Sequence, residues 1–321
     1  MSEGRGSVKA TNESRHAGWV LGAALVGISF AGPLVRLSHA DAVAIAAGRI
    51  GFSLIAIAIL LVVTGEWRDW RVLTRIEWML AVGAGIILAL HFWSWNASIQ
   101  YTTIAASTTL ATSLQPGCVA ILSFLIVHEQ PNRRQMMGLA LATLGAVIIT
   151  GPDLLHAGPA APGSAQNPLL GNLLAAFAGV AAAAYITLGR RLRAKLGAWA
   201  YVAIVYGAAF VTLLTIGGVS GIHIAPQPTR ELLIFVALAV GPMLLGHTGM
   251  NWALKHLPAY IVNLTALGEP VGATILGMVI PGIHEIPRWT TFAGGAVVLA
   301  GVVVTAWTRD EPMVESVADA A

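Results

Sequence analysis

Ten stretches of about 20 mostly apolar residues follow one another along almost the whole of this 321-residue chain. A helix needs about 20 such residues to cross the hydrocarbon core of a bilayer. It also satisfies its own backbone hydrogen bonds, as a lipid environment requires. The sequence therefore predicts an all-α integral membrane protein with ten transmembrane helices. They are expected at residues 17–36, 42–63, 76–96, 101–127, 133–151, 168–188, 199–219, 231–252, 259–281 and 289–307.

The composition excludes a soluble fold of this length. Hydrophobic residues make up 56% of the chain and charged residues 10%, and the mean hydropathy is +0.76. A soluble domain has about a quarter of its residues charged. The net charge of +3 is small, so the expected surroundings are a lipid bilayer and no nucleic-acid partner is indicated. The single cysteine, Cys118, excludes a disulfide framework and a Cys-based metal site.

Lys and Arg are distributed unequally between the two sides of this arrangement. With ten spans both tails lie on one side, which carries fourteen basic residues against three on the other. The fourteen are Arg5, Lys9, Arg15, Arg68, Arg71, Arg75, Arg133, Arg134, Arg190, Arg191, Arg193, Lys195, Lys255 and Arg309. The three are Arg36, Arg230 and Arg288. Because cytoplasmic loops are enriched in Lys and Arg, both termini are expected in the cytoplasm and the protein in the inner (cytoplasmic) membrane.

One motif occurs twice, as SLQPGCVAILSFLIVHEQP at 113–131 and as LGEPVGATILGMVIPGIHEIP at 267–287. In both copies the Glu of the His-Glu pair is followed by Pro at +2 and by Gly at +9 and +16. These residues are Glu129, Pro131, Gly138 and Gly145 in the first copy and Glu285, Pro287, Gly294 and Gly301 in the second. Several matches in one order indicate an internal repeat. Glycines seven residues apart share one helix face, where small residues let helices approach closely.

Each repeat holds five spans, an odd number, so the second copy enters the membrane from the opposite side. Many secondary transporters are built from such inverted-topology repeats, and their two halves rock around a site at the interface. The repeats are expected at residues 17–151 and 168–307. The Pro-, Gly- and Ala-rich segment 152–167 is the expected external linker. Residues 1–16 and 308–321 are the expected cytoplasmic tails.

These features resemble the EamA-type branch of the drug/metabolite transporter superfamily, over roughly residues 17–307. The resemblance is carried by Pro116 with the HEQP turn, by the GEP of Gly268–Pro270 with the HEIP turn, and by the glycines after each turn. Arg49 in the second span, within AAGRIGFSL, also fits. The resemblance implies ten helices, a bacterial inner-membrane location, and export or uptake of amino acids and other small metabolites.

Glu269 is the strongest candidate for a functional residue. It lies about 11 residues into the expected ninth span, roughly 16 Å deep and near the bilayer midplane. A carboxylate at that depth is costly unless it is paired, protonated or facing water, and such residues are functional by default. We therefore interpret Glu269 as a solute- or proton-binding residue, beside a helix break at Pro270. The alternative is a structural Glu that satisfies backbone groups freed by this proline.

Gln115 and Pro116 occupy the corresponding position in the fourth span. Interrupted helices in matching positions of two repeats indicate a transporter's binding site. We therefore expect Gln115 to bind solute and Pro116 to break its helix. Arg49 is the only basic residue away from the ends of the expected spans, where it would counter a solute carboxylate or pair with Glu269. Alternatively, Arg49 lies near the outer end of its helix and snorkels to the surface.

His91 and His247 lie in the third and eighth expected spans, five and four residues before Asn96 and Asn251. The His and Asn residues of the two spans are roughly related by the repeat. Together with Trp95 they are candidates for the wall of a solute- or proton-binding cavity. The alternative for a Trp is the aromatic belt at the membrane interface.

Motifs for other chemistries are absent from the sequence. The two His-Glu turns lack the second His of an HExxH zinc site, and no Walker loop or GxSxG elbow occurs. No cofactor or metal is expected. The predicted function is secondary export of a small organic metabolite such as an amino acid, driven by protons or by the solute gradient. The alternative is a polytopic membrane enzyme acting on a lipid-linked substrate, which would need titratable groups near one interface.

Overall fold

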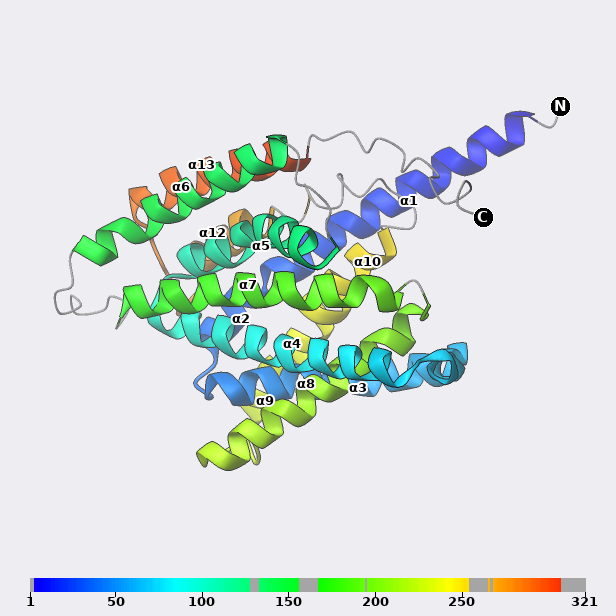
Figure 1. Ribbon diagram of the computed structural model, residues 1–321. Coiled ribbons are helices and arrows are strands. Elements are labelled where there is room, and N and C mark those ends of the chain that lie inside the picture. Colours follow the sequence, from blue (N-terminus) through cyan, green and yellow to red (C-terminus); the bar gives the residue numbers. More distant parts are fainter. Residues whose placement is uncertain are drawn as a thin grey trace.

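The computed structural model describes residues 3–127, 133–155, 167–193, 195–253, 265 and 268–306 of the chain. Within these ranges the protein is helical and contains no strand, as the sequence predicts (Figure 1). The helices are α1 (Glu3–Ser29), α2 (Ala31–Leu37), α3 (Ala42–Thr64), η1 (Glu66–Val72), α4 (Arg75–Tyr101), α5 (Ile104–Val127), α6 (Arg133–Leu155), α7 (Pro168–Arg193), α8 (Ala198–Ser220), α9 (Thr229–Leu238), η2 (Ala239–Thr248), α10 (Gly249–Ala253), α12 (Gly268–Val279) and α13 (Trp289–Ala306).

Six helical segments in the described ranges are long and apolar enough to cross a membrane. They are His16–Leu37, Ala42–Thr64, Arg75–Tyr101, Pro168–Gly189, Ala198–Ser220 and Thr229–Thr248. Two shorter apolar segments, Met136–Ile149 and Trp289–Gly301, fall in α6 and α13. Residues 259–264, 266 and 267 of the expected ninth span lie outside the described residues, and so does the first HEQP turn at 128–131. The count of ten spans therefore stays a prediction.

Local sequence signals account for several helix ends. Asp41 caps α3 by accepting a hydrogen bond from Val43 N at 2.8 Å, and Gly65 ends that helix with φ +72°. Thr74 and Glu77 form a capping box at the start of α4. α1 begins at Glu3, so the described part of the expected tail over residues 1–16 is helical, and the apolar segment long enough to cross a membrane begins at His16.

The helix break expected at Pro116 is not observed, because α5 continues from Ile104 to Val127. A proline ring has a helical φ and removes only one backbone hydrogen bond, and Ser or Thr hydroxyls compensate such losses in membrane helices. Pro270 lies in the first turn of α12. N–H groups there have no acceptor within the helix, so Pro270 removes no hydrogen bond from α12.

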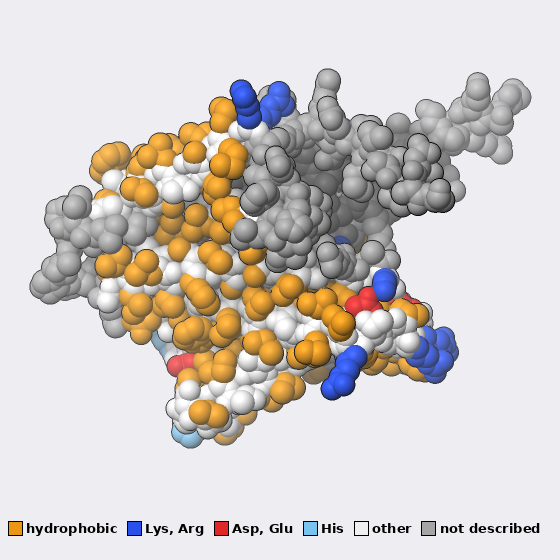
Figure 2. Space-filling view, viewed as in Figure 1, with side chains coloured by type: hydrophobic (Ala, Val, Ile, Leu, Met, Phe, Trp, Pro, Cys, Tyr) orange, Lys and Arg blue, Asp and Glu red, His pale blue; other side chains and the backbone are white. Residues whose placement is uncertain are grey.

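Hydrophobic side chains cover most of the described surface visible in Figure 2, and the Lys and Arg side chains of this face lie at its upper edge and its right-hand end. Ile59, Met79 and Val211, on three different helices, are 60% to 67% exposed. Soluble monomers rarely show apolar patches larger than a few hundred Å². This surface therefore suits lipid contact.

Helices α6 and α13 lie side by side and pack closely through glycines (Figure 1). A Cβ atom on Gly145 would lie 2.6 Å from Gly294 O, and one on Gly294 would lie 2.7 Å from Gly145 O. A Cβ atom on Gly301 would lie 2.7 Å from Gly138 O. Gly145 thus faces Gly294 while Gly138 faces Gly301, so the two helices run antiparallel. In the repeat Gly138 corresponds to Gly294 and Gly145 to Gly301, so the contact is reciprocal, as across a two-fold axis.

At one end of the bundle, loop carboxylates of η1 cap the start of α8. Glu66 accepts hydrogen bonds from Trp199 N at 2.8 Å and Ala200 N at 3.2 Å, and Asp69 accepts one from Gly197 N at 2.9 Å. Carboxylates at a helix N-terminus satisfy its free N–H groups and interact favourably with its dipole. We call this the inner end, because the basic residues of its loops predict the cytoplasmic side.

Contacts at the opposite, outer end join the other set of loops. Arg230 Nη2 donates to Leu37 O at 2.6 Å, linking the start of α9 to the end of α2. Thr102 Oγ1 donates to Asn172 Oδ1 at 2.8 Å, linking the end of α4 to α7. Successive spans cross the membrane in opposite directions, so their loops should alternate between its two sides. The loops that contact each other at each end of the bundle are ones that this rule places on the same side.

We predict that Gly145→Leu and Gly294→Leu each lower the thermal unfolding midpoint of the purified protein in detergent. A larger side chain at either position would meet the backbone of the facing helix, and overpacking of this kind costs about 1–3 kcal/mol. The matched control is Gly151→Leu in α6, because nothing lies within 4 Å of a Cβ atom built there. Equal losses in all three variants would show that the glycine contact is not what these substitutions disturb.

Candidate functional site

Arg49 lies inside the bundle. It is seven residues after the start of α3, roughly 10 Å from the outer end of that helix. The residue is 1% exposed. Its guanidinium carbon is 4.5 Å from the centroid of the Phe92 ring and 5.9 Å from that of Trp95, both on α4. The side chain is therefore held among aromatic rings and does not snorkel to the surface.

The guanidinium of Arg49 is incompletely satisfied. Its Nε and Nη1 atoms are buried and have no hydrogen-bond partner among the described residues. Cation–π contacts contribute about 0.5–2 kcal/mol. Burying an unpaired ion costs several kcal/mol even after relaxation. The two rings therefore do not compensate for the burial of this charge, and the site favours an additional anionic partner.

Four further titratable side chains surround Arg49 closely enough for their charges to interact with it. They come from α4, α8, η2 and α12 and are His91, Tyr206, His247 and Glu269. Glu269 does not form an ion pair or hydrogen bond with Arg49 in the described structure. The two charges thus interact without a direct contact.

Close helix packing positions these side chains. His91 Nδ1 lies 2.8 Å from Ala178 O of α7, and its ring centroid is 6.5 Å from that of Tyr185. His247 lies in η2, a π-helix that packs on α1; a Cβ atom on Gly246 would lie 3.1 Å from Ile28 N. π-Helical segments occur frequently at functional sites.

Glu269 lies in the first turn of α12, where a helix dipole favours negative charge. α12 packs on α1 through another glycine, since a Cβ atom on Gly272 would lie 2.2 Å from Ser29 Oγ. The central cluster, defined here as Arg49, His91, Trp95, His247 and Glu269, therefore draws on α3, α4, η2 and α12. All five residues were expected from the sequence as solute- or proton-binding candidates.

A family model for EamA-like transporters matches this chain twice, at residues 16–151 and 169–307. The chain belongs to the EamA-like transporter family. The resemblance found in the sequence is thereby confirmed, and the matched ranges lie close to the two expected repeats.

Two curated relatives of this EamA-like protein are named as transporters. The chain is 26% identical over 216 residues to YetK, an uncharacterized transporter of Bacillus subtilis, across 67% of this chain and 63% of the relative. That alignment spans less than two thirds of the Bacillus protein. The chain is 23% identical over 292 residues to an uncharacterized transporter of Archaeoglobus fulgidus, across 88% of this chain and 95% of the relative. This EamA-like protein is a multi-pass membrane transporter.

A solved structure titled "Crystal structure of protein" shares the fold. Its TM-score is 0.60 at 16% sequence identity, over 92% of this chain and 99% of that one. At this identity the likeness concerns the arrangement of helices alone.

Among the described side chains, Asn96 and Gln115 are not linked to the central cluster of the EamA-like transporter by any observed contact. Asn96 is fully buried and donates from Nδ2 to Ala42 O at 3.3 Å, so it links α4 to the start of α3. Gln115 is half-buried in α5, and no contact within the described residues links it to Arg49. The side chain of Asn251 lies outside the described part of the structure.

Two aromatic residues were missed by the sequence analysis. Phe92 lies closest to the guanidinium of Arg49 among the rings in contact with it, and the phenol of Tyr206 lies near enough to interact electrostatically with the same group. Aromatic residues are common in apolar spans, so neither carried a signal that distinguished it from a packing residue. Only the repeat pointed to His91 and His247.

At the outer end, Arg36 and Glu285 form an ion pair between the two halves of the transporter. Arg36 Nε lies 2.6 Å from Glu285 Oε1, and Arg36 Nη2 donates to Thr102 O. Glu285 Oε2 accepts from Ile104 N at 2.7 Å, so one carboxylate holds α2 and the start of α5. We call this set of four residues the outer contact. Burial raises the pKa of the Glu285 carboxyl, while the charge of Arg36 acts in the opposite direction.

The HEIP turn gives Glu285 this position. Gly282 has φ +88° and His284 has φ +47°, a left-handed conformation that is uncommon for a residue other than glycine. The chain reverses there, and Glu285 N donates to Gly277 O at 3.0 Å. The sequence analysis treated this turn only as a marker of the repeat.

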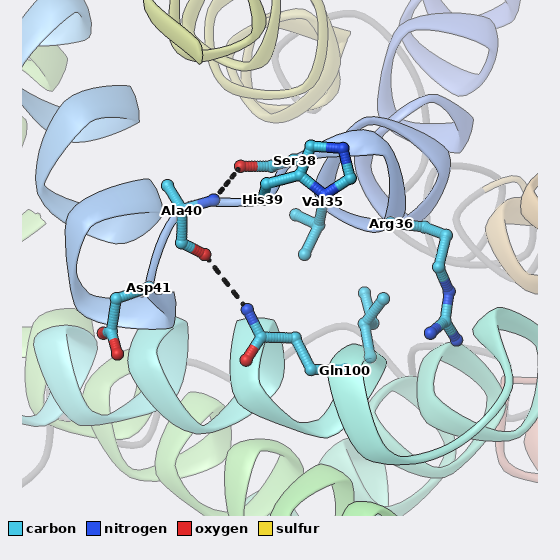
Figure 3. Close-up of a pocket in the computed structure, with 8 residues that line it drawn as sticks. Val35, Arg36, Ser38, His39, Ala40, Asp41 and Gln100 are labelled. Carbon is cyan, nitrogen blue, oxygen red and sulfur yellow. Dashed lines mark hydrogen bonds between the residues drawn. The ribbon is translucent and has the colours of Figure 1, made fainter. Parts of the chain in front are cut away.

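A cavity of about 550 Å³ lies beside the outer contact, at the outer ends of α2, α3 and α4. Figure 3 shows the Arg36 guanidinium on one side of it, Asp41 on the other, and His39 and Gln100 between them. Gln100 Nε2 donates to Ala40 O at 3.2 Å across its floor. α3 also carries Arg49 and α4 carries His91, so the same two helices reach from this cavity to the central cluster.

Proposed function

We propose that this transporter exports a small organic metabolite, of the size and polarity of an amino acid, across the cytoplasmic membrane by alternating access of two inverted repeats. The observation that carries the proposal is the reciprocal packing of α6 and α13. Helices at equivalent places in two repeats meet reciprocally when a two-fold axis passes between them. Since α6 and α13 are antiparallel, that axis lies across the helices and thus in the membrane plane.

The origin of the central cluster supports the same mechanism. Arg49 and His91 belong to the first expected repeat, and His247 and Glu269 belong to the second. Transporters with inverted repeats bind solute and coupling ions at the interface between the repeats. A rocking motion of one half against the other would therefore expose this cluster to each side in turn.

The contacts at the two ends supply the closures that such a motion needs. The outer contact joins Glu285 of the second half to Arg36 of the first. At the inner end, Glu66 and Asp69 of the first half cap α8 of the second. Opening the outer end breaks the first set of bonds and leaves the second intact, and opening the inner end does the reverse.

Glu269 is the proposed carrier of a coupling proton. It is an acidic residue inside the bundle whose charge interacts with Arg49 without forming an ion pair. Binding or release of a proton at Glu269 therefore changes the net charge that a solute meets beside Arg49. Without such a proton, the solute gradient alone would drive transport.

We predict that Glu269→Gln folds normally and loses the pH dependence of transport. Its transport rate should fall by at most about tenfold. The amide is nearly isosteric and is less costly to bury than a charged group, but it cannot carry a proton. The measurement is transport rate against pH in proteoliposomes for the wild type and the variant. Glu77→Gln, which removes a carboxylate near the inner end, is the control and should keep the wild-type pH profile.

A structural role of Glu269 gives a different result in the same measurements. If Glu269 is structural, Glu269→Gln lowers the thermal stability in detergent and leaves the shape of the pH profile unchanged. That pair of results would remove the proton-carrier role and leave transport itself standing.

We also predict that the inner end faces the cytoplasm. In a Cys118→Ser background, an impermeant maleimide should label the His223→Cys variant in intact spheroplasts. The Arg71→Cys variant should react only after permeabilisation, because its loop lies on the side richer in basic residues. Both positions are exposed in the structure. Labelling of Arg71→Cys from outside, with His223→Cys protected, would contradict the orientation.

A further inference from the structure

We infer that the solute carries a carboxylate and that the guanidinium of Arg49 is the group that binds it. This inference rests on the proposed function and adds the chemical class of the solute. The rings of Phe92 and Trp95 lie against the guanidinium and form the walls of this carboxylate subsite.

The first step is the state of Arg49 itself. The side chain is fully buried, and two of its three guanidinium nitrogens lack a hydrogen-bond partner in the described residues. Its contacts with Phe92 and Trp95 lie against the face of the cation and leave the N–H groups of Nε and Nη1 without a partner. N–H donors of a buried guanidinium are best satisfied by anionic oxygen atoms.

The second step is that the protein groups facing Arg49 do not supply this anion in direct contact. From α4 and η2 come two imidazoles, His91 and His247, which bring no negative charge. From α8 comes the phenol of Tyr206. Among the described residues, Glu269 of α12 supplies a carboxylate near Arg49, and its charge acts on Arg49 without an ion pair or hydrogen bond. The N–H donors of Arg49 therefore remain available to a ligand.

The third step concerns which anion fits. A planar guanidinium matches the two oxygens of a carboxylate, and the match is lost when one oxygen becomes an amide NH₂. One buried cation balances one negative charge. A phosphate group carries nearly two charges at neutral pH, and the second would face Glu269. The arrangement therefore favours a monocarboxylate over a phosphate or a neutral amide.

The test compares carboxylic acids with their own primary amides. The probes are benzoate and benzamide, isovalerate and isovaleramide, and leucine and leucinamide, titrated against the purified full-length protein in detergent. Binding is followed by the shift of the thermal unfolding midpoint. In the wild type, we expect at least one acid to bind about tenfold more tightly than its amide. In Arg49→Gln that ratio should fall to about one.

Two further variants separate a binding role from a structural one. Arg49→Lys keeps the charge without the planar fork, so the preference for the acid should persist in reduced form. Arg71→Gln is the matched control, because Arg71 also lies over a Trp ring, at 5.5 Å from that of Trp67, but is exposed at the inner end. This variant should keep the full wild-type preference.

The assignment is overturned if no acid binds more tightly than its amide in the wild type, or if Arg49→Gln keeps the preference. Uptake of the same probes into proteoliposomes separates this failure from failure of the proposed function. Transport of an amide as fast as its acid would overturn the carboxylate subsite and leave transport standing. Arg49-dependent binding of an acid, with none of the probes transported, would support the subsite and count against the proposed function.

Discussion

The glycine contact between α6 and α13 is the constraint from which the rest of the arrangement follows. With hydrogen as the side chain on both sides, the two backbones approach closely, and a Cβ atom on Gly145 would lie 2.6 Å from Gly294 O. In a bilayer the hydrophobic effect does not drive helices together, so close packing of small residues contributes much of their association. Because the repeat relates the two facing pairs of glycines to each other, the same contact that joins the helices also fixes the relation between the halves. Sites built from both halves then come to lie between them.

The buried charge of Arg49 is the second constraint. A guanidinium among Phe92 and Trp95 is held in place by packing, but its N–H groups are not satisfied by the residues around it. A protein selected only for stability would replace such a group with an apolar one, since buried charges often destabilise relative to well-packed hydrophobic residues. The presence of Glu269 nearby, without an ion pair, leaves the guanidinium ready for an external anion. Arg49 therefore destabilises the empty protein but serves solute binding. A bound solute carboxylate would supply the anionic partner that the buried guanidinium lacks.

The sequence predicted the helices well and the contacts between them poorly. Apolar length placed α3 and α8 within one or two residues, because the bilayer sets that length directly. The repeat identified the glycines of α6 and α13. It also pointed to His91 and His247, through their similar spacing to Asn96 and Asn251. The π-helix at η2 and the continuity of α5 through Pro116 were not predicted, because both depend on how neighbouring side chains satisfy the backbone. The ion pair of Arg36 with Glu285 was also missed, since it joins residues far apart in sequence whose proximity only the packed bundle creates.

The most direct test of the account is whether the two ends open separately. Spin labels at His39 and Ile286 would report the outer end, and labels at Arg71 and Ala198 the inner end, by electron–electron distance measurements in a Cys118→Ser background. All four positions are exposed. Glu285→Gln weakens the outer contact and should lengthen only the outer distance, whereas Glu66→Gln should lengthen only the inner one. If either substitution lengthens both distances together, the halves do not alternate and the account is contradicted.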